Sequence, residues 1–113
     1  MEDELRKDFA DADLSGANLS YADFAGGDLS GAYLVGADLS YADLRHADLS
    51  HADLSHADLR YTDLRYANVV GADFTGAFVD GIVYDDFTDA CCVVGRDRFF
   101  RWLEKQNQLR DKE

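Results

Sequence analysis

The stretch GADLSYADLRHADLSHADLSHADLR, Gly36 to Arg60, repeats a five-residue unit in which alanine, aspartate and leucine follow one another. A large apolar residue recurs at every fifth position from Phe9 to Val79, and the residue two before it is nearly always alanine. Successive leucines would rotate by about 140° around an α-helix, and an odd period would place them on opposite faces of a flat strand. Both series can face one side only if the chain turns a corner once per repeat, which predicts a coil.

The alanine and the leucine of each repeat are two residues apart, so both point to one side of a short extended segment. Repeated corners would wind the chain into an all-β solenoid whose lumen is filled by leucine and alanine, with each coil hydrogen-bonded to the next. Glycine favours tight turns with unusual dihedral angles, and it stands at corner positions 16, 26, 31, 36, 71, 76 and 81. Proline is absent, as expected when most backbone N–H groups are needed for pairing.

Residues of the same type also recur twenty positions apart. The three series are Tyr21, Tyr41 and Tyr61; Asp23, Asp43 and Asp63; and Arg45 and Arg65. Four repeats per coil would place the members of each series directly above one another, about 4.8 Å apart. This spacing favours four repeats per coil over other numbers, and it predicts a tyrosine ladder on one face.

The stretch quoted above and the stretch GANLSYADF, Gly16 to Phe24, resemble pentapeptide repeat proteins. The resemblance covers residues 7–81 as fifteen units in register. It implies a right-handed quadrilateral β-helix of about four coils, in which the central leucine or phenylalanine and the preceding alanine point inward.

The chain divides into three parts. Residues 1–8 are charged and form a lead-in or cap, and residues 9–94 form the β-helix. The repeat is interpreted as regular to Val79 and irregular over residues 80–94. In this last part we interpret three residues as repeat centres displaced from the regular register: Ile82, Phe87 and Cys92. Residues 95–113 have the composition of an α-helix.

The expected C-terminal helix carries a group of apolar side chains: Phe99, Phe100, Trp102 and Leu103. An open coil end exposes backbone groups and an apolar lumen, so these side chains can cover the lumen as a cap. Several pentapeptide repeat proteins have a C-terminal helix used for dimerisation, and this resemblance implies a second role as the interface of a homodimer. The sequence leaves both roles open.

Composition indicates a single cytoplasmic domain. The chain has 113 residues, no apolar run long enough to cross a membrane, and no signal-peptide core in its first residues. Its two cysteines, Cys91 and Cys92, are adjacent in sequence and are expected to remain thiols in a reducing compartment. No cofactor is expected.

The repeats are strongly acidic. Residues 8–81 hold thirteen aspartates and three arginines, a net charge of −10 from thirteen minus three. This charge opposes direct nucleic-acid binding, because DNA itself carries one negative charge per about 1.7 Å of its axis. Pentapeptide repeat proteins of the quinolone-resistance type are recognised as DNA-like rods that act on DNA gyrase, which implies mimicry as one function. The same aspartates can bond the backbone at corners, so the fold alone explains much of the acidity.

No catalytic or metal site is expected from the histidines, His46, His51 and His56. At intervals of five they occupy corners on successive faces, so they would circle the rod without converging on one metal ion. The many serines and aspartates are repeat positions and form no recognisable catalytic group. The sequence therefore favours a protein that is not an enzyme.

Departures from the repeat suggest where a partner would bind. We identify five candidates for a protein-binding face: Tyr21, Tyr41 and Tyr61 in the ladder, and Tyr33 and Phe78 at positions normally held by Asp or Asn. The main hypothesis is a scaffold that binds an unknown protein partner. The alternatives are a DNA-mimicking inhibitor or protector of a type II topoisomerase, and a consensus-like or designed repeat protein with no evolved partner.

Overall fold

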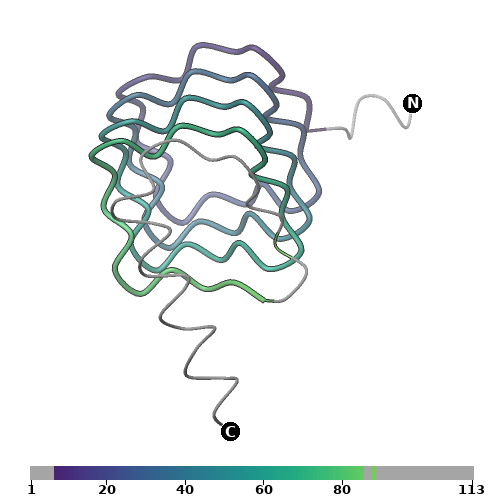
Figure 1. Cartoon of the computed structure of the whole chain (residues 1–113), viewed down its shortest axis with the longest axis vertical. Helices are drawn as coiled ribbons and strands as arrows, with labels where there is room; N and C mark the ends of the chain where they lie inside the picture. The colour runs from purple at the N-terminus through teal and green to yellow at the C-terminus, as the bar shows by residue number, and fades with distance from the viewer. Residues whose placement is uncertain (1–6, 86–87, 89–113) are drawn as a thin grey trace, which may run out of the picture.

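The computed structural model describes residues 7–85 and residue 88. Over this range the chain winds through stacked four-sided coils, from the purple N-terminal end to the green C-terminal end of Figure 1. Residues 7–85 contain no helix and no extended strand, and their regular element is the isolated parallel β-bridge between neighbouring coils. No helix in the described part of the chain has the length and hydropathy of a membrane span.

Some expectations concern residues outside this range. They are the charged lead-in as far as residue 6, Phe87, Cys91, Cys92, and the C-terminal helix over residues 95–113 with Phe99, Phe100, Trp102 and Leu103. These lie outside the described residues. The cap and the homodimer helix therefore stay predictions.

Every bridge joins residues that are twenty apart, so four repeats close one coil. The bridging residues define four sides, each formed by four stacked residues. Side 1 holds Asp8, Asp28, Asp48 and Asn68; side 2 holds Asp13, Tyr33, Asp53 and Asp73; side 3 holds Asn18, Asp38, Asp58 and Phe78; and side 4 holds Asp23, Asp43, Asp63 and Val83. The coil length predicted from the tyrosine, aspartate and arginine spacing is the one observed.

The lumen is filled as the repeat predicts. The central residues from Leu29 to Phe74 are between 0% and 1% exposed, and the alanines that precede them from Ala32 to Ala77 are equally buried. Phe9 and Phe24 meet edge to face, with ring centroids 5.3 Å apart, near the N-terminal end of the core. Thr62 replaces an alanine, and its buried hydroxyl donates a hydrogen bond to the carbonyl of Leu39 at 2.7 Å.

In a repeat that carries aspartate, the backbone donors are satisfied in a regular way, as one example shows. Leu49 and His51 donate to carbonyls of the following coil, and Asp48 donates to a carbonyl of the preceding coil. Ala47 closes the turn, and Ser50 donates its N–H to Oδ1 of Asp48 at 2.9 Å. The aspartate of the repeat is therefore a structural acceptor for the backbone, which is the role that the fold alone predicts for it.

A turn with an unusual backbone forms each corner. The residue two after each centre has a positive φ between 58° and 72°, and the next N–H bonds back to the centre's carbonyl, which is the pattern of a type II turn. Glycine holds seven of these positions. The other eight are held by larger residues: Asp11, Tyr21, Tyr41, His46, His51, His56, Tyr61 and Tyr66.

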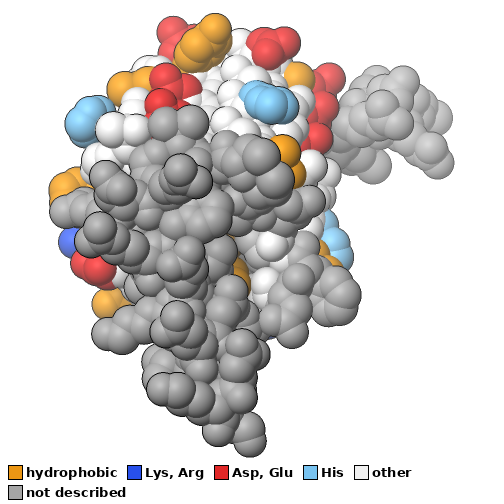
Figure 2. All heavy atoms as spheres, viewed as in Figure 1, with side chains coloured by type: hydrophobic (Ala, Val, Ile, Leu, Met, Phe, Trp, Pro, Cys, Tyr) orange, Lys and Arg blue, Asp and Glu red, His pale blue; other side chains and the backbone are white. Residues whose placement is uncertain are grey.

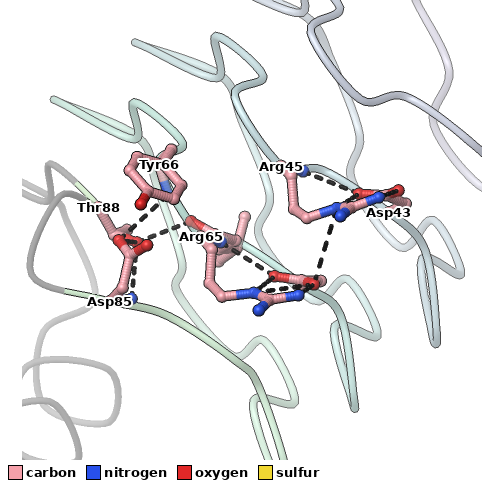
Figure 3. Close-up of polar contacts among 8 residues, drawn as sticks. Asp43, Arg45, Arg65, Tyr66, Asp85 and Thr88 are labelled. Atoms are coloured by element: carbon pink, nitrogen blue, oxygen red, sulfur yellow. Dashed lines mark hydrogen bonds and ion pairs between the residues drawn. The ribbon is translucent and has the colours of Figure 1, made fainter.

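The regular register extends beyond Val79. Ile82 closes a turn with Val79 and is 4% exposed, and Val83 bridges to Asp63. Ile82 therefore occupies the alanine position of a regular repeat. The expectation that Ile82 is a displaced repeat centre is wrong. The pattern of hydrogen bonds between coils changes at Asp85. Its carboxylate replaces the backbone carbonyl as the acceptor for the N–H of Tyr66, at 3.2 Å (Figure 3).

Candidate protein-binding surface

Four corners separate the four sides, and corner 3, between sides 3 and 4, carries the predicted tyrosine ladder. The rings of Tyr21 and Tyr41 are stacked with centroids 4.9 Å apart and planes 3° from parallel. Those of Tyr41 and Tyr61 are also 4.9 Å apart, at 15°. The three tyrosines are 72%, 50% and 52% exposed in chain order. A column of phenol rings therefore projects from one edge of the coil.

The ring of Tyr61 ends the column by lying over Gly81. A Cβ added to Gly81 would stand 2.5 Å from the Tyr61 ring. The rings of His51 and His56 lie in the same way over Gly71 and Gly76. Each of these corner side chains therefore leans toward the following coil, and its aromatic face covers a corner where glycine leaves room.

Corner 4, between sides 4 and 1, carries a second stack that the sequence analysis missed. His46 and Tyr66 have ring centroids 4.7 Å apart and planes at 9°. Tyr66 is 49% exposed. The two residues are twenty apart, so the spacing that revealed the tyrosine ladder would have found this pair if unlike aromatic residues had been compared.

Side 4 brings together the aspartate and arginine series that recur at intervals of twenty. Nη2 of Arg45 lies 2.7 Å from Oδ2 of Asp43, and its Nε lies 3.9 Å from Oδ2 of Asp63 in the next coil. Arg65 pairs with Asp63 at 2.6 Å (Figure 3). Lys7 reaches Asp23 at 3.1 Å. Side 4 is therefore a column of alternating charges.

These contacts lower the pKa of the side 4 carboxyl groups. Hydrogen bonds from the Arg45 side chain lower the pKa of Asp43 from 3.8 to about 2, against the opposing effect of burial. Burial raises the pKa of Asp63, but the hydrogen bonds from Arg65 outweigh it, and the pKa lies below 3.8. Both carboxylates are therefore charged throughout the neutral and mildly acidic range.

The Arg45–Asp43 pair predicts a dependence of stability on pH. The pKa of Asp43 is lower in the folded state than in the unfolded state. Its contribution to the free energy of unfolding is therefore complete above about pH 4 and is lost as the pH falls toward about 2. We expect Arg45→Ala to lower the free energy of unfolding at neutral pH by a small amount, because solvent screens this exposed pair. Urea denaturation of both proteins should show the difference shrinking toward zero at about pH 2. A difference that is constant with pH would contradict this role.

Phe78 extends the ladder onto side 3, whereas Tyr33 does not. The guanidinium carbon of Arg60 lies 5.9 Å from the centroid of the Phe78 ring, and Arg60 also pairs with Asp58 at 2.7 Å. Arg60 directly precedes Tyr61 in the corner. Tyr33 bridges to residues of side 2, so side 3 separates it from the ladder. The structure thus brings four of the five candidate residues together and places Tyr33 on another side.

The three histidines occupy three different corners. His46 is at corner 4, His51 at corner 1 between sides 1 and 2, and His56 at corner 2 between sides 2 and 3. Within residues 7–85 and 88, no three His, Cys, Asp or Glu side chains form a group that could hold a metal ion. Histidine, acidic and apolar side chains are interspersed on the face shown in Figure 2.

Net negative charge is concentrated on sides 1 and 2, because the described cations pair with aspartates of the other two sides. Seven carboxyl groups lie there: Asp8, Asp28 and Asp48 on side 1, Asp11 at the corner, and Asp13, Asp53 and Asp73 on side 2. The described Lys and Arg residues, namely Lys7, Arg45, Arg60 and Arg65, all pair with aspartates of sides 3 and 4. The acidic half of the coil and its aromatic, charge-paired half are therefore distinct surfaces.

The twenty-residue coil, the inward alanine and leucine, and the corner turns agree with the family comparison. The sequence matches the family described as pentapeptide repeats in eight copies, over residues 8–44 and 37–76. The chain belongs to the pentapeptide repeat family. Members of this family form right-handed quadrilateral β-helices. A comparison with curated proteins finds no significant match.

Solved structures of other pentapeptide repeat proteins are similar to the chain. One from Nostoc PCC 7120 is 37% identical with a TM-score of 0.69, and the match covers 81% of this chain and 87% of that one. Another, from Cyanothece 51142, is 32% identical with a TM-score of 0.43, and covers 74% of this chain and 63% of that one. A plasmid-mediated fluoroquinolone resistance protein is a more distant match, at 20% identity and a TM-score of 0.38, covering 76% of this chain and 61% of its own.

Proposed function

We propose that this pentapeptide repeat protein is a non-enzymatic scaffold that binds a partner protein through its tyrosine ladder. The docking surface consists of Tyr21, Tyr41 and Tyr61, extended onto side 3 by Arg60 and Phe78. The observation that supports it best is the column of three stacked tyrosines, each at least half exposed. Large exposed aromatic residues beside an arginine are typical of the energetic centres of protein interfaces.

The ladder is ordered before any partner binds. Stacking restricts each ring, and the corner backbone is held by hydrogen bonds: Tyr21 and Tyr41 donate their N–H groups to carbonyls of the following coil at 2.9 and 3.0 Å. Binding of a partner would therefore cost little additional side-chain entropy of these tyrosines, which raises affinity for a given contact area. The repeat does not require tyrosine here, because glycine holds the same backbone conformation at seven corners.

Because glycine holds the same backbone conformation at other corners, the ladder tyrosines can be replaced by glycine to remove the rings while the fold is kept. We expect Tyr21→Gly/Tyr41→Gly/Tyr61→Gly to remain folded, because glycine adopts the positive φ of these corners without strain. The matched control is Tyr33→Asp/Tyr66→Gly, which removes two exposed tyrosines elsewhere and restores the residue types that the repeat uses at those positions.

The test compares proteins captured by the three immobilised chains from a lysate of the organism that encodes the protein. Proteins retained by the wild type and the control, but absent from the ladder variant, would support the proposal, and each would then be tested with purified protein by calorimetry. Retention of the same proteins by all three folded chains would contradict it. Circular dichroism and thermal melting establish that each chain is folded.

The net negative charge of sides 1 and 2 favours a second candidate function, inhibition or protection of a type II topoisomerase by DNA mimicry. Asp28→Asn/Asp48→Asn/Asp53→Asn/Asp73→Asn would remove charge and keep the fold, since Asn18 and Asn68 already accept the backbone bonds made by aspartate elsewhere. A supercoiling assay with purified gyrase tests the idea. Inhibition by the wild type that is lost in this variant supports mimicry, and no effect of the wild type excludes it.

A further inference from the structure

The tyrosine ladder places phenol groups of adjacent coils in direct contact. Tyr41 is the middle ring, with Tyr21 and Tyr61 each 4.9 Å away between centroids and close to parallel. The chain has six tyrosines. Tyr66 stacks on a histidine, and Tyr33 lies on side 2 between Asp13 and Asp53. Tyr84 follows Val83 at the end of side 4 and is half-buried. Corner 3 is therefore where the described structure stacks tyrosine on tyrosine.

We propose that the ladder is an oxidative modification site, at which Tyr41 forms a dityrosine cross-link with Tyr21 or Tyr61. The oxidant is a one-electron oxidant of the peroxidase class, supplied with hydrogen peroxide. It removes one electron from each of two phenols, and each phenol releases its O–H proton to water. The unpaired electrons are shared with the ring carbons ortho to oxygen.

Coupling then forms one carbon–carbon bond between the ortho carbons of the two rings. The hydrogen on each of these carbons moves to the phenol oxygen, so both rings become aromatic phenols again. The net reaction removes two hydrogen atoms from the protein, and one hydrogen peroxide is reduced to two waters. No other bond of the chain breaks.

The geometry favours this reaction over coupling between molecules. Radical coupling requires two oxidised rings to meet, and the fold already holds them one coil apart, which gives the second ring a high effective concentration. Each ring is also at least half exposed, so an oxidant in solution can reach it. Coupling requires the two rings to leave the stack and meet edge to edge. Side-chain motion at the surface, on a timescale of nanoseconds, provides this excursion from the stacked arrangement.

The cross-link would join residues twenty apart in sequence and so tie one coil to the next. A covalent bond that closes a loop restricts the unfolded chain, as a disulfide does. We therefore expect the oxidised protein to melt at a higher temperature than the unmodified protein. This inference does not depend on the binding role of the ladder, because its test measures the cross-link itself.

The experiment treats the full chain, at low concentration, with peroxidase and hydrogen peroxide, and isolates the monomer by size exclusion. The expected product is a monomer with dityrosine fluorescence and a mass lower by two hydrogen atoms. Peptide mapping should locate the bond between Tyr41 and Tyr21 or Tyr61. The decisive variant is Tyr41→Phe, which keeps a stackable ring but lacks the phenol. The matched control, Tyr33→Phe/Tyr66→Phe, removes two phenols outside the ladder.

We expect Tyr41→Phe to abolish the cross-link in the monomer and the control to retain it. Tyr21→Phe should leave a single product, between Tyr41 and Tyr61. The proposal is overturned if oxidation produces only covalent dimers, if the bond maps to Tyr33, Tyr66 or Tyr84, or if Tyr41→Phe forms monomeric dityrosine as the wild type does. Absence of any dityrosine after complete consumption of the peroxide would overturn it equally.

Discussion

Replacing Leu49 with alanine is expected to lower the free energy of unfolding by about 2–5 kcal/mol. Leu49 is 0% exposed in the middle of the lumen, with Leu29 in the preceding coil and Val69 in the following coil at the equivalent position. Leu29 and Val69 are themselves packed in the lumen, so they can relax only partly into the space. The substitution therefore removes buried apolar surface and also opens a cavity.

The control for Leu49→Ala is Ser50→Ala, one residue along the chain. Ser50 is half-buried at a corner and its hydroxyl bonds to Asp48 at 2.6 Å, so its loss should cost less than about 1 kcal/mol. Equilibrium denaturation in urea measures both. If the leucine substitution were no more costly than the serine substitution, position 49 would not face a packed lumen.

The second large effect is expected at a corner glycine. Gly36 and Gly76 both occupy corner 2 with φ of 68° and 69°, but a Cβ on Gly36 would meet nothing within 4 Å, whereas one on Gly76 would stand 2.5 Å from Nδ1 of His56. Gly36→Ala should cost about 1 kcal/mol for the left-handed backbone. Gly76→Ala should cost roughly 2–3 kcal/mol, because the strained alanine also displaces the imidazole ring.

A double-mutant cycle separates these two causes. In a His56→Gly background the ring is absent, so Gly76→Ala should cost the same as Gly36→Ala does in the wild type. The comparison uses urea midpoints and slopes for five proteins, the four of the cycle and Gly36→Ala. Equal costs for Gly76→Ala with and without His56 would show that the ring does not cover this corner.

Much of the fold could be predicted because the same physical constraint acts fifteen times. A period of five is incompatible with burial on one helix or one flat strand, so the repeat itself predicts corners. The interval of twenty among Tyr21, Tyr41 and Tyr61 then predicted how many repeats close a coil, and the bridges have that interval. Arg45 lies between Asp43 and Asp63 for the same reason.

The backbone of the non-glycine corners could not be predicted in this way. Tyrosine and histidine seldom adopt a positive φ, yet Tyr41 and His46 have φ of 62° and 61°. Stacking on the next coil and the ladder of hydrogen bonds hold them there, and both are tertiary effects that local propensity omits. Ile82 was misassigned for a related reason, since a large apolar residue at an alanine position resembles a new repeat centre.

The candidate surface was only partly predictable. The ladder follows from identical residues at one spacing. Tyr33 was grouped with it because it departs from the Asp or Asn of the repeat, and its position in the coil places it on side 2. The link between Phe78 and the ladder is made by Arg60, through a contact between side chains that differ in type. Such a contact leaves no periodic signal in one sequence.

The coil that closes every twenty residues underlies both the fold and the ladder, and paired cysteines test it directly. In a Cys91→Ser/Cys92→Ser background, Ser30→Cys/Ser50→Cys places two thiols at the same corner of adjacent coils, about 4.8 Å apart between backbones, which is within disulfide range. The second pair, Ser30→Cys/Ser55→Cys, places them at different corners. After mild oxidation, thiol counting and mass spectrometry should find an intramolecular disulfide in the first protein and free thiols in the second. Free thiols in the first protein, or equal cross-linking in both, would contradict the twenty-residue coil.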